Sequence, residues 1–190
     1  MKSMKLALLA AAVFASASSF AAQYAYQDQQ ITIAFSGKEI SVDNCVLKDG
    51  KPVKDGCKKT VANVAELTEK LSKRLKEAED LLKEEGALLA NAKKMATAKD
   101  AQKIKDDASG ESYVMLSLGE GFKLPLNTKL IEAGDFSLVV EALKANKARF
   151  ERSISYLKSG KLPEGQTAKQ YSDISDMFEL GNVIEFSKAL

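Results

Sequence analysis

The segment from Thr60 to about Asp106 limits the folds open to this chain more than any other stretch. It contains no proline and a single glycine, Gly86, and it is rich in Ala, Leu, Lys and Glu, a composition typical of a long helix. With heptads counted from Val61, nine of the eleven a and d positions are apolar, and so are four adjoining g positions. Such a stripe is wider than the seam of a two-stranded coiled coil. The pattern therefore predicts one long helix, capped by Thr60, that packs on more than one neighbour.

This predicted helix is longer than the other predicted helices can cover. About 45 residues at about 1.5 Å each span about 67 Å. Gly86 near its midpoint costs about 1 kcal/mol relative to alanine, which predicts a bend or a close helix contact there. Apolar surface that stays uncovered often marks a binding face. We therefore predict a partner-binding face made of Leu81, Leu88, Leu89, Ala92 and Met95.

Residues 1 to 21 have the layout of a secretory signal peptide. Lys2 and Lys5 provide the positive start, residues 6–15 are apolar, and Ser19 and Ala21 are small residues at the positions that signal peptidase reads. The pattern predicts cleavage near Ala21 and a periplasmic or secreted mature protein. No later stretch approaches the roughly 20 apolar residues of a spanning helix, so we expect no membrane span.

Cleavage of the signal changes the net charge. The full chain has 28 Lys and Arg against 26 Asp and Glu, and removal of Lys2 and Lys5 leaves 26 against 26. A neutral chain with interspersed signs has no bulk attraction to nucleic acid or to an anionic membrane face. The charge balance thus favours a protein partner, self-association or a small molecule, and disfavours nucleic acid.

Residues 22–59 are predicted to form a β-hairpin and a disulfide loop. Apolar and polar residues alternate around the Ser36-Gly37 turn, with Ile31 and Ile33 before it and Ile40 and Val42 after it. A Lys-Asp-Gly triplet at 48–50 and another at 54–56 predict two turns that bring the segment ends together. The only two cysteines, Cys45 and Cys57, are therefore expected to form a disulfide in an oxidising compartment. The alternatives are an intermolecular bridge or free thiols.

The remaining chain is predicted to complete a helical domain over 60–190 that packs with 22–59 as one unit. Residues 113–118 fit a helix or a strand equally, and 119–126 are expected to form a loop. Helical patterns cover about 127–133, 135–159 and 167–180, with Gly181-Asn182 ending the last one. The apolar tail 183–190 either docks on the body or binds a partner. The predicted fold class is mainly α: a helical bundle built on one long helix, with a small N-terminal β-hairpin and disulfide loop.

Few residue patterns in the chain carry chemistry. The chain has no histidine, which removes the Ser-His and Cys-His nucleophile pairs and the usual zinc ligand. Ser155 and Lys158 match a Ser-x-x-Lys pattern, but the companion motifs of penicillin-recognising enzymes are missing. Gly119-Glu120-Gly121 lacks the rest of a phosphate-binding signature. We expect no catalytic residues, no metal and no cofactor.

Together these observations predict a non-catalytic periplasmic or secreted helical protein that acts through protein–protein interaction, in envelope assembly or in a chaperone-like or adhesin-like role. The first alternative is a periplasmic small-ligand-binding protein with a pocket between the helices and residues 113–126. The weaker alternative is a hydrolase that uses carboxylates or the Ser155/Lys158 pair.

Overall fold

The computed structural model describes residues 20–119, 122–162, 171–187 and 190, and the predicted signal peptide lies almost entirely outside them. A four-stranded antiparallel sheet with the order β1-β2-β3-β4 comes first, and a three-stranded sheet with the order β5-β6-β7 lies between the helices. The elements are β1 (Phe20–Tyr26), β2 (Gln29–Ser36), β3 (Glu39–Lys48), β4 (Lys51–Asn63), α1 (Val64–Lys83), α2 (Glu85–Ala96), β5 (Lys103–Lys105), β6 (Ser112–Ser117), β7 (Lys123–Asn127), α3 (Thr128–Ala133), α4 (Ser137–Ser159) and α5 (Tyr171–Glu185).

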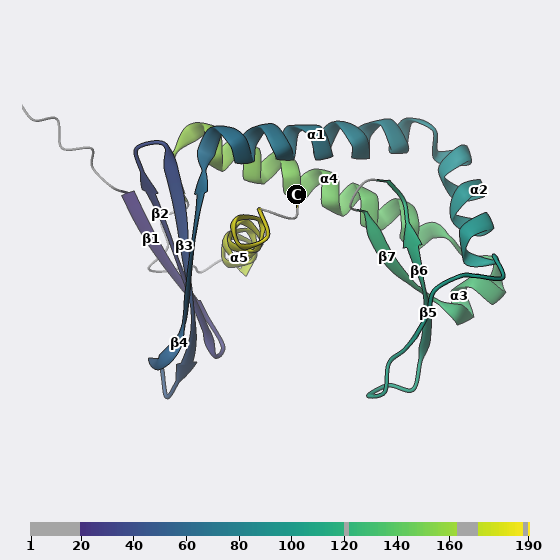
Figure 1. Cartoon of the computed structure of the whole chain (residues 1–190), viewed down its shortest axis with the longest axis horizontal. Helices are drawn as coiled ribbons and strands as arrows, with labels where there is room; N and C mark the ends of the chain where they lie inside the picture. The colour runs from purple at the N-terminus through teal and green to yellow at the C-terminus, as the bar shows by residue number, and fades with distance from the viewer. Residues whose placement is uncertain (1–19, 120–121, 163–170, 188–189) are drawn as a thin grey trace, which may run out of the picture.

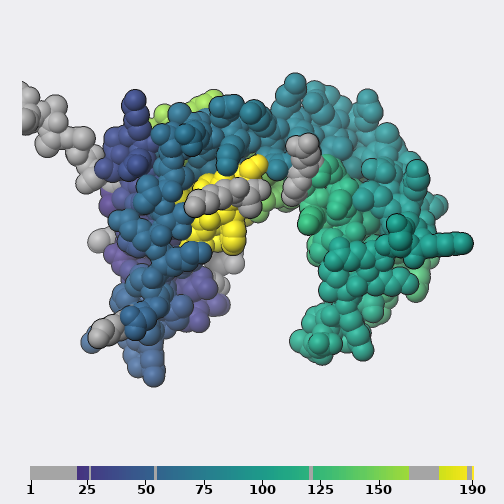
Figure 2. Space-filling model, viewed as in Figure 1, coloured from purple at the N-terminus to yellow at the C-terminus, as the bar shows by residue number. Residues whose placement is uncertain are grey.

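The molecule is an arch (Figure 1). Helices α1 and α4 pack along each other and form its bar. The four-stranded sheet stands at one end, with α5 against it, and the three-stranded sheet stands at the other end with α2 and α3. Figure 2 shows the hollow between the two ends, with the last part of the chain on its surface.

The prediction of a mainly α bundle is wrong, because the protein is a mixed α/β structure with two sheets. The predicted hairpin around Gly37 exists as β2 and β3, but β1 and β4 flank it on either side. Four strands give a sheet that buries the centre of one face, whereas a lone hairpin is marginal. The covered face carries alternate residues of the strands: Ala22, Tyr24, Ile31, Ile33, Ile40 and Val42.

The second Lys-Asp-Gly triplet does not form a turn. The first triplet does, since Asp49 and Gly50 connect β3 to β4 with positive φ angles of 53° and 72°. Between β3 and β4, Cys45 pairs with Cys57 and Leu47 pairs with Pro52. Val46 of β3 is therefore the one residue opposite residues 53–56 of β4. Those residues form a wide bulge within a continuing strand.

The long helix predicted over 60–106 is also wrong, because four elements share that range. Residues 60–63 finish β4, and α1 ends at Lys83. Glu84 has φ −111° and ψ 51°, outside the helical region, so the chain bends there and continues as α2. The bend lies two residues from the predicted site at Gly86. After Ala96 the apolar stripe fades, and residues 103–105 form the exposed strand β5.

Asn63, and not Thr60, caps α1. Its side-chain oxygen accepts hydrogen bonds from the backbone nitrogens of Ala65 at 2.9 Å and Glu66 at 3.2 Å. These bonds satisfy two of the donors that a helix start leaves without partners. Thr60 is instead paired with Val42 across β3 and β4.

Asn63→Ala should therefore lower the free energy of unfolding by about 1 kcal/mol, because the two helix donors lose their acceptor. Urea denaturation of the wild type and the variant measures this difference. Thr60→Ala serves as the control for the alternative cap and should change the stability by less, because Thr60 is in a strand. An equal loss in both variants, or no loss in Asn63→Ala, would contradict the assignment.

The second half of the chain follows the predictions more closely. The predicted helical turns at 127–133 and the helix at 135–159 are present as α3 and α4. Residues 113–118, which the pattern left open, are largely strand β6. The loop prediction for 119–126 is wrong from Lys123 onward, where β7 begins, and Pro125 is tolerated because β7 is an edge strand.

Helix α5 passes through Gly181-Asn182 and ends at Glu185, so the predicted break there is wrong. The predicted start at 167–170 lies outside the described residues. Val183 and Ile184 are buried, and the described part of the predicted tail is therefore docked on the body. Gly181 accounts for the docking. It is buried against Ile31 and Val42, where the absence of a side chain lets α5 approach the sheet closely.

Candidate functional site

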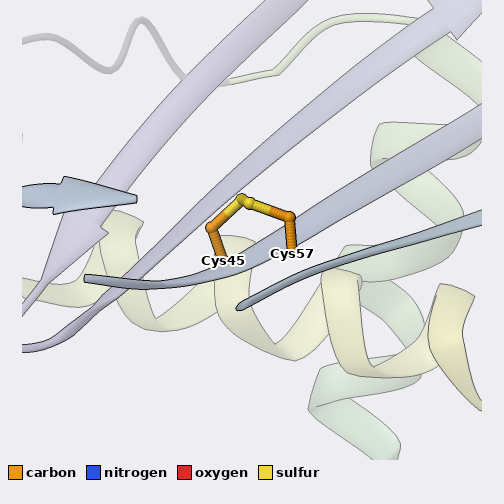
Figure 3. The surroundings of a disulfide bond; sticks show 2 residues. All are labelled: Cys45 and Cys57. Atoms are coloured by element: carbon orange, nitrogen blue, oxygen red, sulfur yellow. A yellow bond between two sulfur atoms is a disulfide. The ribbon is translucent and has the colours of Figure 1, made fainter. Parts of the chain in front are cut away.

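The predicted Cys45–Cys57 disulfide is confirmed (Figure 3). The two residues lie directly opposite each other on β3 and β4, with a sulfur–sulfur distance of 2.10 Å and a Cα–Cα distance of 4.0 Å. Ile40 and Val42 are on the covered face, so Cys45 on the same strand is on the opposite face, away from α5. The bridge holds the two ends of the bulged hairpin together, and its role is structural.

A small cavity is lined by residues of α1, α4, α5 and the start of β7. We call it the central pocket, and its volume is about 230 Å³. Four separate stretches of sequence contribute to it, and its lining consists of Arg74, Phe122, Lys123, Asn146, Arg149, Phe150, Glu179, Asn182, Val183, Phe186 and Leu190. It combines aromatic walls with cationic side chains, which is the usual character of a site for a small organic anion.

The two arginines of the central pocket have different surroundings. Arg74 donates from Nη1 to Glu77 Oε2 at 3.1 Å and from Nη2 to the backbone oxygen of Leu190 at 3.1 Å. Arg149 donates from Nη2 to Asn146 Oδ1, while its Nε atom is buried and has no hydrogen-bond partner among the described residues. Arg74 is therefore held in place, whereas Arg149 retains a donor for another group.

The aromatic walls consist of three phenylalanines. Phe122 and Phe150 are buried and meet edge to face, with ring centroids 6.2 Å apart at 73°. Phe186 is 61% exposed, which is unusual for a large apolar side chain beside a cavity. The guanidinium carbon of Arg149 lies 5.4 Å from the centroid of the Phe150 ring, within cation–π range.

Sequence reasoning missed the residues of the central pocket. One compositional signal pointed to them: the chain contains only three arginines among its 28 basic residues, and Arg74 and Arg149 are two of the three. Arginine differs from lysine in presenting a planar fork that matches a carboxylate. A search for the rare basic residue would have selected these positions without showing that they meet.

The predicted partner-binding face is largely internal. Leu88 and Ala92 are buried, with exposed fractions of 4% and 0%, because α2 packs on β6 and α4. Leu81, Leu89 and Met95 are partly buried against the same core. Two shallow grooves remain nearby, of about 730 Å³ and about 540 Å³, and they include Leu81 and Leu89 respectively. The face is therefore interrupted, because the chain covers its centre.

Among the described residues, the titratable groups show no arrangement typical of acid–base catalysis. Ser155 and Lys158 are both exposed on α4. Hydrogen bonds from the Tyr113 hydroxyl and then from Lys129 lower the pKa of Glu111. The pKa of Asp135 is lowered by the Ser137 side chain and backbone. Such shifts favour the charged carboxylate, whereas a carboxyl group that donates a proton in catalysis needs a raised pKa.

The described residues lack two further features. They contain no group of three or more His, Cys, Asp or Glu side chains placed to hold a metal ion. None of the described helices is long and apolar enough to cross a bilayer. The central pocket is the candidate site because it brings aromatic and charged side chains from four stretches of the chain together.

Comparison of the chain with protein-family models, with curated proteins and with solved structures finds no match.

Proposed function

We propose that this protein is a non-catalytic binding protein of the periplasm or the extracellular space that holds a segment of a polypeptide partner in the hollow of its arch. The observation that carries the proposal is the hollow itself, bordered by two sheets and by α5 (Figure 2), together with Phe186, which is exposed and lines the central pocket. An exposed aromatic side chain in a concave surface is a common anchor for a partner. The location rests on the predicted signal peptide and on the disulfide, which hints at an oxidising compartment.

The shape also supports the choice of an extended segment as the occupant. The hollow is open along its length between the two sheets, so a chain can pass through it without a folded partner having to fit (Figure 2). Extended segments bind by placing a few side chains in pockets. The central pocket, lined by residues of α1, α4 and α5, would receive one such side chain.

Phe186→Ala should weaken binding of hollow-directed peptides at least tenfold, because the variant loses the exposed aromatic contact. Peptides of twelve random residues displayed on phage are selected on the mature protein, and their affinities are measured by fluorescence anisotropy. Leu138→Ala is the matched control, since Leu138 is 38% exposed and does not line the central pocket. Failure to select any peptide, or equal losses in both variants, would refute the proposal.

A second candidate function is the binding of a small ligand, and the central pocket favours it. The pocket lies between the helices and residues 122–123, within the region where the sequence placed a ligand pocket. In this case the hollow provides access and the central pocket is the whole site. The two candidates differ in whether a free small molecule alone saturates the protein.

A further inference from the structure

The central pocket contains a hydrogen-bond donor without a partner. Arg149 Nε is buried and unbonded among the described residues. A buried charged donor left without an acceptor costs about 1–3 kcal/mol or more, so such atoms in folded proteins usually meet a water molecule, an ion or a ligand. Arg149 lines the pocket, so its guanidinium lies next to a group bound there, but Nε itself is closed to solvent and gains an acceptor only if the side chain shifts toward that group.

The charges around the pocket favour an anion. Among the described residues, three cationic side chains line it, Arg74, Lys123 and Arg149, against one acidic side chain, Glu179. That carboxylate is already paired, since Glu179 Oε2 lies 3.1 Å from Nη2 of Arg152, which does not line the pocket. Arg74 is likewise paired with Glu77, at 3.1 Å. Arg149 and Lys123 are therefore the lining cations that form no ion pair among the described residues.

The shape of the pocket limits the rest of the ligand. Its volume of about 230 Å³ corresponds to roughly eight water molecules at about 30 Å³ each. Phe122, Phe150 and Val183 supply buried apolar walls, and Phe186 stands exposed beside them. A bound group therefore has a compact apolar body of about eight to ten non-hydrogen atoms with one anionic end.

We propose that the central pocket binds a carboxylate with a small apolar body, with the Arg149 guanidinium as its principal anchor and the phenylalanines around its apolar part. The proposal rests on the pocket being a binding site, as in the second candidate function. A planar carboxylate accepts two parallel hydrogen bonds from a guanidinium, which lysine cannot provide. The carboxylate can belong to a free organic acid or to an acidic side chain of a polypeptide in the hollow.

Benzoate is the probe, and benzyl alcohol is its uncharged counterpart of similar shape. Titration of the full mature protein, followed by calorimetry and by ¹⁵N chemical shifts, should show benzoate binding at least tenfold tighter than benzyl alcohol. Arg149→Gln should weaken benzoate binding at least tenfold, since glutamine removes the charge-assisted hydrogen bonds to the carboxylate. Lys158→Gln removes the same charge from an exposed position on α4 and should leave the affinity unchanged.

The proposal is overturned if 10 mM benzoate does not bind, if Arg149→Gln binds it as well as the wild type, or if benzyl alcohol binds equally. Folding of Arg149→Gln is checked by its thermal unfolding, and Arg149→Lys provides a second variant that keeps the charge and loses the planar fork. Competition by acetyl-Ala-Glu-Ala-amide, but not by its Gln analogue, identifies a side-chain carboxylate as the source. Benzoate binding without such competition identifies a free acid. Selection of hollow-directed peptides without benzoate binding would overturn this inference alone and leave the proposed function standing.

Discussion

Gly181→Leu should lower the free energy of unfolding by about 3 kcal/mol and loosen α5 from the four-stranded sheet. A Cβ atom built on Gly181 would lie 1.9 Å from Ile31 Cδ1, 3.3 Å from Ile31 Cγ1 and 3.4 Å from Val42 Cγ2. Ile31 and Val42 are 1% and 0% exposed, so neither can move into solvent. Overpacking a filled core costs about 1–3 kcal/mol even for small additions, and leucine adds four carbons. Urea denaturation, with hydrogen exchange of the α5 amides, measures both effects.

The smaller change Gly181→Ala separates steric clash from helix propensity. Alanine gains about 1 kcal/mol over glycine in a helix, which offsets part of the clash, so the net loss should be about 1 kcal/mol. Ile31→Val removes the Cδ1 methyl that a new Cβ would meet. In the double variant Ile31→Val should cost less than its usual 0.5–1.5 kcal/mol, because it relieves the clash.

Gly86→Ala is the matched control for these variants. A Cβ on Gly86 would meet nothing within 4 Å, and the residue lies in helix α2. The substitution should therefore raise stability by about 0.5–1 kcal/mol. Equal effects of alanine at positions 86 and 181 would show that Gly181 is not required by the packing of α5 on the sheet.

Local signals in the sequence predicted the elements that depend on local structure. Alternation around Gly37 predicted β2 and β3, the Asp49-Gly50 pair predicted the turn after β3, and Gly160 predicted the end of α4, where its φ is 62°. Because the chain has two cysteines, the prediction of an oxidising compartment was enough to predict that they pair with each other. Each of these features is decided by residues close together in the chain or, for the disulfide, by the number of cysteines.

The missed elements depend on contacts between distant residues. The end of β4 was predicted to be the start of a helix because its residues 57–61 are polar or outward facing and show no buried apolar alternation. Val61, for example, is 50% exposed. An edge strand contacts a neighbour on one side, and here Ala62 is its buried apolar residue after the bulge. Strand β5 is exposed at all three positions and forms because β6 supplies a partner. In both cases, pairing with a neighbouring strand overrode the local secondary-structure propensity of the residues.

The candidate site was beyond local prediction for a similar reason. Arg74, Phe122, Arg149 and Phe186 belong to four elements or connections, and the bend at Glu84 decides which of them meet. A straight helix over 60–106 would have carried residues 85–96 away from β6 and α4, which they now contact. The hollow exists because the helix bends and the two sheets stand at opposite ends of the bar (Figure 1).

Loss of the Cys45–Cys57 disulfide should lower the free energy of unfolding by about 3 kcal/mol. The two cysteines are 12 residues apart, and the chain-entropy estimate for closing a loop of that size is about 3 kcal/mol. The effect should extend beyond the hairpin, because β3 and β4 both contact α5. Urea denaturation of the oxidised protein, the reduced protein and Cys45→Ser/Cys57→Ser measures the loss, and the last two should agree.

The same experiment contains its own control, because the chain has no other cysteine. Reductant should therefore leave the double variant unchanged, and any effect there would point to a cause other than the bridge. Hydrogen exchange should show the largest rise in opening along residues 45–57, where the bulge interrupts strand pairing, and a smaller rise in α5. Equal stability of the oxidised and reduced proteins would mean that strand pairing alone holds the bulged hairpin closed. The disulfide would then not stabilise the sheet surface on which α5 packs.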